Sequence, residues 1–296
     1  MLDEAVAARR VVVTARAKVN LALHVVGQRA DGYHLLDSIV AFAALRGTGG
    51  DVLTIDFAAD AAGEPAFAVS GPFAHDVPHG PGNSALAAAE AVGGIRALTL
   101  EKNLPVAAGI GGGSADAAAV LRAAAYQTGH PLAALGALAL SLGADVPVCL
   151  AGTPARMGGI GEALSPIGLP ETPCVLVNPR AAVATPAVFR ALAKKDNPPL
   201  AAGWPAPRSP AALAAALAEA RNDLGPPAAR VAPVIDKVVA ALAGEAGCLL
   251  ARMSGSGATV FGLFADAAAS ERAAAALRVR HPGWWITPAV LEGAAG

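Results

Sequence analysis

The chain has 296 residues, of which 54% are hydrophobic and 15% are charged, and its formal net charge at pH 7 is −1. This composition excludes a disordered chain, and the length predicts about two domains. No basic cluster is larger than the pairs Arg9-Arg10 and Lys194-Lys195, which argues against a nucleic-acid partner but still allows a small anionic ligand.

No stretch reaches the roughly 18 uninterrupted apolar residues of a membrane-spanning helix. The sequence begins Met-Leu-Asp-Glu and lacks an apolar core followed by a cleavage site, so we expect no signal peptide, no membrane partner and a cytoplasmic location. The cysteines lack C-x-x-C spacing, which predicts buried thiols rather than disulfides or zinc ligands. They are Cys149, Cys174 and Cys248.

Alternating hydrophobicity predicts a β-strand that runs from Arg10 to about Val26. Because side chains alternate along a strand, Lys18, Asn20 and His24 share one face. A solvated sheet edge is the ordinary explanation of that polar face, and the functional alternative requires an anionic partner. The core-facing residues would be Val19, Leu21, Leu23 and Val25.

A turn is predicted at Asp31-Gly32, directly before Tyr33 and His34. An aromatic ring beside an imidazole suits a flat heterocycle, because the ring can stack while the imidazole bonds its polar edge. The alternative is a turn tyrosine that covers the core. Further strands are predicted over residues 51–57 and 66–69.

The stretch from Leu104 to Gln127 is a glycine-rich loop that leads into an alanine-rich helix, predicted from Ser114 onwards. Such a loop brings the unpaired amides of a helix N-terminus close to an anion, with phosphate as the obvious candidate. The loop has neither the lysine of a P-loop nor the last glycine of a dinucleotide motif. A phosphate site and a tight helix-entry turn are both open on this evidence. The glycines are Gly109, Gly111, Gly112 and Gly113.

Other signals predict a helix after Asn83 or Ser84 that ends at Gly93, a strand over 97–101, and a helix over 131–142. Asp145 follows, at an expected junction between helix and apolar strand. A buried carboxylate there would need hydrogen bonds or a cation, although a lone aspartate is more often a cap or turn residue than a base.

The second half begins with a hairpin-like stretch over 156–167 and a strand over 174–178. Thr185 is the predicted N-cap of a helix, with Pro186 at its first position. A proline-rich surface loop over 196–210, two helical stretches, a second glycine turn before a strand, and a helix over 271–278 follow.

Four motifs together resemble the GHMP kinase superfamily, in the family's order and over nearly the whole chain. The first resembles the branch whose substrate is 4-diphosphocytidyl-2-C-methyl-D-erythritol, of the non-mevalonate isoprenoid pathway. The motifs are A-K-V-N-L-A-L-H-V-V-G-Q-R-A-D-G-Y-H-L-L-D-S from Ala17, P-V-A-A-G-I-G-G-G-S-A-D-A-A from Pro105, L-G-A-D-V-P-V from Leu142, and S-G-S-G-A-T-V-F from Ser254.

The resemblance implies an α+β, two-domain GHMP kinase fold. A ribosomal-protein-S5-like nucleotide domain would cover residues 1–156, and a ferredoxin-like domain would cover 157–296. It also implies an ATP-dependent kinase that uses Mg²⁺ and phosphorylates the 2-hydroxyl of a small molecule with a cytidine diphosphate moiety.

The resemblance further implies roles for individual residues. Asp145 would take the proton from the substrate hydroxyl, and Lys18 would stabilise charge. Tyr33 and Phe189 would sandwich the cytosine, with His34 at its edge. Two further residues of the substrate pocket would be Asn20 and Thr185. The residues on the ATP side would be Asn83, Pro105, Gly109, Gly111, Gly112, Gly113 and Ser114.

One departure concerns the metal. Some family members have two serines and an asparagine where this chain has Ser114, Ala115 and Asp116, so a hydroxyl that could help to hold phosphate or magnesium is missing. The metal ligands are therefore left unassigned.

Two alternatives are open. Another GHMP kinase could act on homoserine, mevalonate or a sugar, but the D-G-Y-H turn disfavours it because those substrates carry no cytosine. A non-catalytic nucleotide- or RNA-binding module is disfavoured by the near-zero charge and by the presence of both Lys18 and Asp145.

Overall fold

The computed structural model describes residues 9–58, 61, 63–80 and 82–294. The described chain forms two compact units. The first contains residues 9–16, Thr48–Val106 and Gly112–Ala151, and the second contains Ala17–Gly47, Ala107–Gly111 and the chain from Gly152 onwards. The proposed domain boundary at 156/157 stays a prediction. The expectation about a signal peptide concerns residues 1–8 and lies outside the described residues.

The first unit contains a four-stranded sheet in the order β1-β4-β6-β5. The strands β1 and β6 pair antiparallel with β4, and β5 pairs parallel with β6. A parallel pair needs a crossover, which α1 provides. The bounds are β1 (Arg9–Ala15), β4 (Asp51–Phe57), β5 (Ala66–Ser70), α1 (Ser84–Val92) and β6 (Ile95–Glu101).

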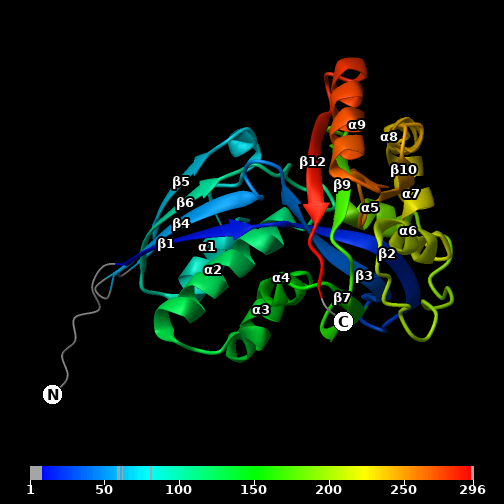
Figure 1. The fold of residues 1–296 in the computed structure, drawn as a ribbon. Coiled ribbons are helices and arrows are strands. Elements are labelled where there is room, and N and C mark those ends of the chain that lie inside the picture. Colours follow the sequence, from blue (N-terminus) through cyan, green and yellow to red (C-terminus); the bar gives the residue numbers. More distant parts are fainter. Residues whose placement is uncertain (1–8, 59–60, 62, 81, 295–296) are drawn as a thin grey trace. The chain divides into compact units, whose positions relative to one another are not determined.

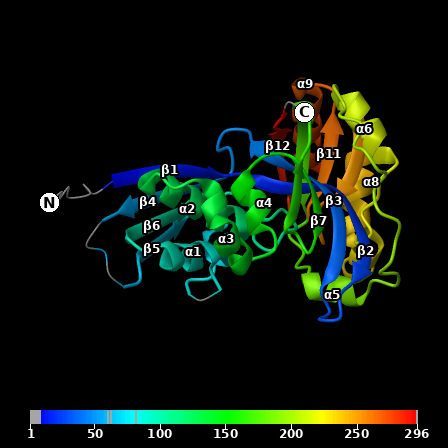
Figure 2. The same ribbon diagram turned by 90° about the horizontal axis from the view of Figure 1, so that it is seen from below.

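Helices α1 and α2 pack together on one face of this sheet (Figures 1 and 2). Most of their buried residues are alanines, whose small side chains let the two backbones approach closely. Helix α2 spans Gly112–Thr128, and the remaining elements of the unit are short. Their bounds are η1 (Ala74–Asp76), η2 (Leu132–Leu135), α3 (Gly136–Leu142) and α4 (Val146–Ala151).

Most predicted elements of this unit are confirmed, including α1 with its Asn83 cap and its end at Gly93. The predicted helix over 131–142 is a 3-10 turn followed by α3. The strand predicted after Asp145 is wrong, because residues 146–151 form the helix α4. Pro147 is the second residue of α4, a position where the helix needs no amide donor. Most residues of α4 are buried, and a short apolar run of this kind has the same sequence pattern as a buried strand.

The second unit contains an eight-stranded sheet in the order β10-β11-β9-β12-β3-β7-β8, with β2 also paired to β3. All of these pairs are antiparallel. The bounds are β2 (Ala17–Gln28), β3 (His34–Leu45), β7 (Ala155–Gly159), β8 (Ala163–Pro166), β9 (Thr172–Asn178), β10 (Cys248–Met253), β11 (Val260–Phe264) and β12 (Trp285–Leu291).

The single strand predicted from Arg10 to Val26 is two strands in two different sheets, divided at Arg16. All residues from Ala17 to Val25 are buried, so the solvated-edge explanation of Lys18 and its neighbours is wrong. Alternation alone could not reveal that later segments of the chain cover the polar face of β2.

Helices α8 and α9 pack on strands of this sheet, as Figure 1 shows. The core between them is aliphatic and aromatic, with Phe264, Leu242 and Leu277 among its fully buried members. Three helices occur where two were predicted before the second glycine turn, and β3, β10 and β12 were not predicted. The bounds are α5 (Thr185–Arg190), α6 (Pro210–Ala218), α7 (Gly225–Val231), α8 (Val234–Ala243) and α9 (Ala267–Arg280).

Two of the three cysteines, Cys149 and Cys174, are buried as predicted, whereas Cys248 is half-buried. Burial raises the pKa of the Cys174 thiol to about 12. Among the helices of the described residues, none combines the length and the hydropathy required to cross a bilayer.

Candidate active site

The polar face of β2 carries a buried hydrogen-bond chain that begins at Lys18. The Lys18 ammonium donates to Asn20 Oδ1 over 2.9 Å, and Asn20 Nδ2 donates to Ser38 Oγ on β3, also over 2.9 Å. The Ser38 hydroxyl in turn donates to the Ala22 carbonyl over 2.6 Å. Lys18 and Asn20 are 3% and 1% exposed. Because every link in this chain is satisfied, the ammonium has a fixed position on the strand.

The part of the glycine loop that belongs to the second unit, Ala107–Gly111, lies against this face. The Lys18 amide donates to the Ile110 carbonyl over 2.9 Å. A Cβ on Gly111 would lie 3.0 Å from both Cβ and Cε of Lys18, and Gly111 has a φ of +60°. Only glycine permits both the left-handed backbone and the close approach. The loop thus lies directly beside the lysine.

The second glycine turn, residues 254–259, holds the same loop from another side. Ser254 Oγ donates to the Gly109 carbonyl over 2.8 Å and accepts from the Asn20 amide over 3.0 Å. A Cβ on Gly109 would lie 2.6 Å from the Gly257 carbonyl oxygen. The sequence analysis identified this turn as a motif but gave no role to Ser254. In the structure, Ser254 holds the glycine loop through its bond to Gly109.

Thr185 lies at the start of α5, but it is not the N-cap, because the cap position is Ala184 and no side chain caps the helix. Its hydroxyl instead lies 2.7 Å from Ser256 Oγ of the second glycine turn. The predicted substrate-pocket residue Thr185 is therefore joined to this turn through a serine that the sequence did not single out.

The end of the glycine loop and the start of α2 belong to the first unit. Gly112, Gly113 and Ser114 form the first turn of this helix, whose leading amides have no carbonyl partner within the helix. Gly113 is exposed, and a Cβ there would lie 3.4 Å from Ser84 Oγ at the start of α1. The N-termini of α1 and α2 therefore lie together, and both favour an anion.

Asn83 caps α1, since its Oδ1 accepts from the amides of Ala85 and Leu86 over 2.9 and 3.1 Å. Its Nδ2 donates to the Pro78 carbonyl, so the whole side chain has a structural role. Pro105 is buried at the other end of the loop. The predicted contacts of both residues with ATP stay predictions.

Asp145 is half-buried and directly precedes α4, where its carbonyl accepts from the Cys149 amide over 3.2 Å. The carboxylate thus belongs to the residue directly before the first turn of α4. Asp145 belongs to the first unit and Lys18 to the second.

The D-G-Y-H turn lies next to α5 in the second unit. The rings of His34 and Phe189 stack with centroids 4.6 Å apart and planes 23° apart, while the Tyr33 side chain is 59% exposed. Burial, and then the charge of Lys195, lower the pKa of His34. His34 Nε2 is buried and has no hydrogen-bond partner within the described part of the chain. A neutral imidazole with an unsatisfied nitrogen can bond the edge of a ligand.

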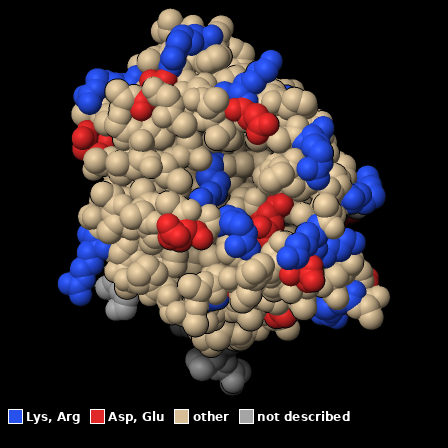
Figure 3. All heavy atoms as spheres, turned by 90° about the vertical axis from the view of Figure 1, so that its right-hand side faces the viewer, with Lys and Arg blue, Asp and Glu red and all other residues tan. Residues whose placement is uncertain are grey.

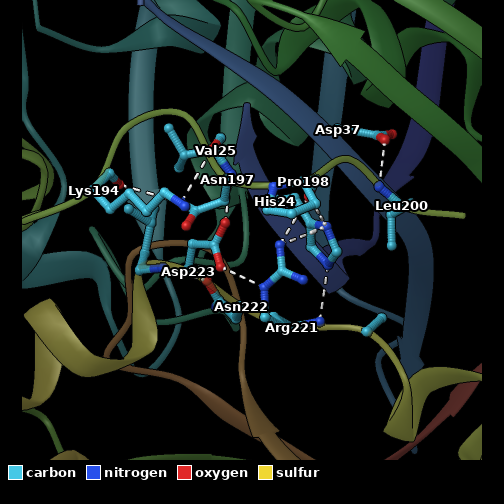
Figure 4. Close-up of polar contacts among 12 residues, drawn as sticks. His24, Val25, Asp37, Lys194, Asn197, Pro198, Leu200, Arg221, Asn222 and Asp223 are labelled. Carbon is cyan, nitrogen blue, oxygen red and sulfur yellow. Dashed lines mark hydrogen bonds and ion pairs between the residues drawn. The ribbon is translucent and has the colours of Figure 1, made fainter. Parts of the chain in front are cut away.

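The first residues of the proline-rich stretch are fixed to β2 and β3 (Figure 4). The Asn197 amide donates to the Val25 carbonyl over 3.0 Å, and the Leu200 amide donates to Asp37 Oδ2 over 2.9 Å. The Pro198 carbonyl lies 3.0 Å from His24 Nδ1. This segment is one reason why the polar face of β2 is buried.

Residues 221–223 hold β2 from the same side. The Arg221 amide donates to His24 Nε2 over 3.0 Å, which makes Nε2 the acceptor and Nδ1 the donor to Pro198. Arg221 also donates through Nη2 to the Pro198 carbonyl, and Asp223 Oδ2 accepts from the Val25 amide (Figure 4). Burial, and then the Arg221 charge, lower the pKa of His24.

A separate cavity of about 570 Å³ in the second unit is lined by α7, α8 and β10. Its polar lining includes Arg230, Asp236 and Arg252, and none of the predicted site residues. Figure 3 faces the side of α7 and α8, where basic and acidic side chains are interspersed around a hollow. This face carries no uniform basic patch.

No three His, Cys, Asp or Glu side chains gather as a metal site within the residues that the structure describes. The helix-terminal amides at Gly113 and Ser114 suit phosphate oxygens rather than a cation. We assign no protein ligand to a magnesium ion among the described residues.

Two family descriptions match the chain: GHMP kinases N terminal domain over residues 77–153, and GHMP kinases C terminal over residues 206–281. The chain is 56% identical over 280 residues to a 4-diphosphocytidyl-2-C-methyl-D-erythritol kinase of Dinoroseobacter shibae, with 94% of each chain covered. It is 48% identical to a protein of the same description from Sinorhizobium medicae, over the full length of both chains.

Solved structures agree with this. A crystal structure of 4-(cytidine 5'-diphospho)-2C-methyl-D-erythritol kinase matches with a TM-score of 0.73 and 35% identity, covering 97% of this chain and all of the other. A homoserine kinase from Cytophaga hutchinsonii matches with a TM-score of 0.66 and 16% identity, covering 96% and 95%, which indicates the shared fold alone.

Proposed function

The chain belongs to the family of 4-diphosphocytidyl-2-C-methyl-D-erythritol kinases, within the GHMP kinases, and we propose that it phosphorylates the 2-hydroxyl of that compound. It is an ATP-dependent small-molecule kinase with the α+β GHMP fold that the sequence predicted. The proposed reaction belongs to the non-mevalonate route to isoprenoid precursors and would take place in the cytoplasm.

The glycine loop and the start of α2 would hold the ATP phosphates. Phosphoryl transfer requires positioning and charge stabilisation more than covalent chemistry from the protein. The exposed Gly113 and the neighbouring Ser114 offer main-chain amides in the first turn of a helix, where the macrodipole also favours negative charge. Mg²⁺ bound to the nucleotide would neutralise part of the phosphate charge.

Lys18 would stabilise the charge that develops on the transferred phosphoryl group. Support comes from its buried hydrogen bond to Asn20 and from its contact with Gly111, which hold the ammonium beside the loop. Such a preorganised cation stabilises a transition state more than a mobile one, because no reorganisation is needed when the charge forms. Asp145 would accept the proton of the attacking hydroxyl, as a general base.

The specificity for a cytidine diphosphate compound would reside in the turn at Tyr33 and in α5. The observation that carries this proposal is the unsatisfied, buried Nε2 of His34 beside the Phe189 ring, with the exposed Tyr33 ring next to it in the chain. A pyrimidine offers both a face for stacking and an edge for a hydrogen bond, whereas homoserine, mevalonate and sugars offer no such face. Asn20 and Thr185 would contact the remainder of the substrate.

The test is a phosphate-transfer assay with purified protein, ATP and Mg²⁺, in which the cytidyl compound, homoserine and mevalonate are compared as acceptors. We expect turnover with the cytidyl compound and at most trace turnover with the others. Turnover of homoserine or mevalonate without turnover of the cytidyl compound would overturn the substrate assignment. Nucleotide binding without transfer to any acceptor would favour a non-catalytic binding module.

A further inference from the structure

The two ends of the glycine loop in the first unit are joined by three buried ionisable side chains, of which the sequence analysis named only Asp116, as a departure from the family motif. Lys102 follows β6 and precedes the loop, Asp116 lies in the first turns of α2 after the loop, and Asp51 is the first residue of β4. Lys102 Nζ lies 2.6 Å from Asp51 Oδ2 and 2.6 Å from Asp116 Oδ2. Lys102 and Asp116 are each 3% exposed, and Asp51 is fully buried.

The Asp51 carboxylate also holds the entry to the loop. Its Oδ1 accepts from the amides of Asn103 and Leu104 over 2.6 and 2.7 Å. These bonds fix the main chain at the point where it leaves the sheet and begins the loop. One oxygen of Asp51 thus holds the loop entry, and the other holds the lysine that reaches the helix.

The ammonium lies at the helix start as well as at Asp116. A Cβ on Gly112, the first residue of α2, would lie 3.2 Å from Lys102 Nζ and 3.9 Å from Asp51 Oδ2. The first turn of α2 therefore packs against the lysine. The neighbouring residues Gly113 and Ser114 carry the amides that would donate to the phosphates. A shift of Lys102 would move this turn.

The three groups lie close enough for their charges to interact. Burial opposes the charge on Lys102, but Asp116 and Asp51 outweigh it and raise the pKa of the ammonium. Burial also raises the pKa of Asp116 to about 8, against the lowering effect of Lys102. Asp116 Oδ1 is buried and has no partner within the described residues. Asp116 therefore binds a proton more tightly than an exposed aspartate does.

We propose that Asp51, Lys102 and Asp116 are positioning residues that preorganise the first turn of α2 for the ATP phosphates by joining the entry of the glycine loop to its exit. A buried ion pair contributes little net stability, because desolvation offsets the attraction between the charges, whereas its short bonds define geometry closely. This inference rests on the proposed binding of ATP by the loop and is independent of which acceptor is phosphorylated.

The test compares three variants of the full chain by calorimetric titration with ADP and by steady-state kinetics. Asp116→Ala removes the acceptor for Lys102, and Asp116→Asn keeps a neutral acceptor of the same shape. Asp56→Ala is the control, because it removes the exposed ion pair between Arg10 and Asp56 in the same sheet. We expect the Kd for ADP to rise roughly tenfold or more in Asp116→Ala and to stay within about threefold of wild type in the other two.

A purely structural role predicts a different result. A lower melting temperature of Asp116→Ala with an unchanged Kd for ADP would overturn the inference, and so would equal losses in Asp116→Ala and Asp116→Asn. If Asp116→Ala does not fold, Asp116→Ser replaces it, since a serine is too short to reach Lys102 but can bond a carbonyl of its own helix. Wild type that binds no ADP would refute the nucleotide site itself, which separates failure of the proposed function from failure of this inference.

Discussion

The main-chain amide of Lys18 donates to the carbonyl of Ile110 over 2.9 Å, so the lysine that we propose as the charge stabiliser is bonded through its own backbone to the glycine loop. Its side chain is held independently by Asn20. The positions of the loop and of the ammonium are therefore coupled, and a change in one should be measurable in the other.

This coupling predicts the effect of Gly111→Ala. The added methyl would lie 3.0 Å from Lys18 Cβ and Cε, and the φ of +60° adds about 1 to 2 kcal/mol of backbone strain. We expect kcat to fall roughly tenfold, because the ammonium is displaced from its place beside the loop. Gly129→Ala is the matched control, since its φ is +71° and a Cβ there meets nothing within 4 Å. Equal kcat values in the two variants would argue against the coupling.

The assignment of Asp145 as the base predicts that Asp145→Asn loses turnover but keeps the nucleotide. The amide has the shape of the carboxylate but cannot accept the proton of the substrate hydroxyl, and general base catalysis contributes about 10² to 10⁴ in rate. We expect kcat to fall by that factor while the Kd for ADP, measured by calorimetry, stays near the wild-type value. Turnover close to wild type would eliminate Asp145 as the base.

The stacked pair of His34 and Phe189 predicts a variant that affects one substrate only. Phe189→Ala removes a ring that would stack on cytosine, an interaction of about 1 to 3 kcal/mol. We expect the KM for the cytidyl acceptor to rise roughly tenfold or more, with the KM for ATP unchanged, and Phe189→Tyr to resemble wild type. A rise in both KM values would indicate general disturbance of α5 instead.

Asp116 predicts how stability depends on pH. Its pKa is raised from 3.8 to about 8 on folding, so between these values the folded chain binds a proton that the unfolded chain does not. This group therefore makes stability fall as pH rises, by up to about 1.4 kcal/mol per pH unit. Lys102, with its pKa raised above 10.5, stays protonated throughout this range.

We therefore expect Asp116→Asn, which cannot titrate, to gain stability relative to wild type as the pH rises from 5 to 8. The measurement is the free energy of urea unfolding at several pH values across that range. Parallel curves for the two proteins would show that Asp116 has no raised pKa.

His24 predicts a pH effect of the opposite sign. Its pKa is lowered on folding, so its protonation favours the unfolded chain, and stability is lost as the pH falls below the unfolded value of about 6.5. A proton on Nε2 would also break the bond from the Arg221 amide. We expect His24→Gln to lose less stability than wild type between pH 7 and pH 5 in the same unfolding assay. The exposed His130→Gln serves as the control, and a variant curve identical to wild type would contradict the role of His24.

The sequence by itself determined the helices and strands that are bounded by clear capping and turn residues. Asn83 and Gly93 bound α1, the glycines before Ser114 begin α2, and the hairpin over β7 and β8 lies where the turn-rich stretch predicted it. Helix caps, glycine turns and alternating hydrophobicity depend on only a few neighbouring residues, so they can be recognised without knowledge of the rest of the chain. The four motifs, in order, were also sufficient to predict the GHMP fold and the kinase activity.

Only the tertiary structure decided which distant residues contact each other. The segment predicted as one strand forms two strands, which lie in different sheets and are divided at Arg16. Residues 197–201 and 221–223 cover the polar face of β2, and Lys102 lies between Asp51 and Asp116. A lone lysine or aspartate in a sequence carries no sign of burial, because its partners lie 14 and 51 residues away from Lys102. Burial and pairing arise when distant segments pack, and they convert ordinary charged residues into the groups that fix the loop.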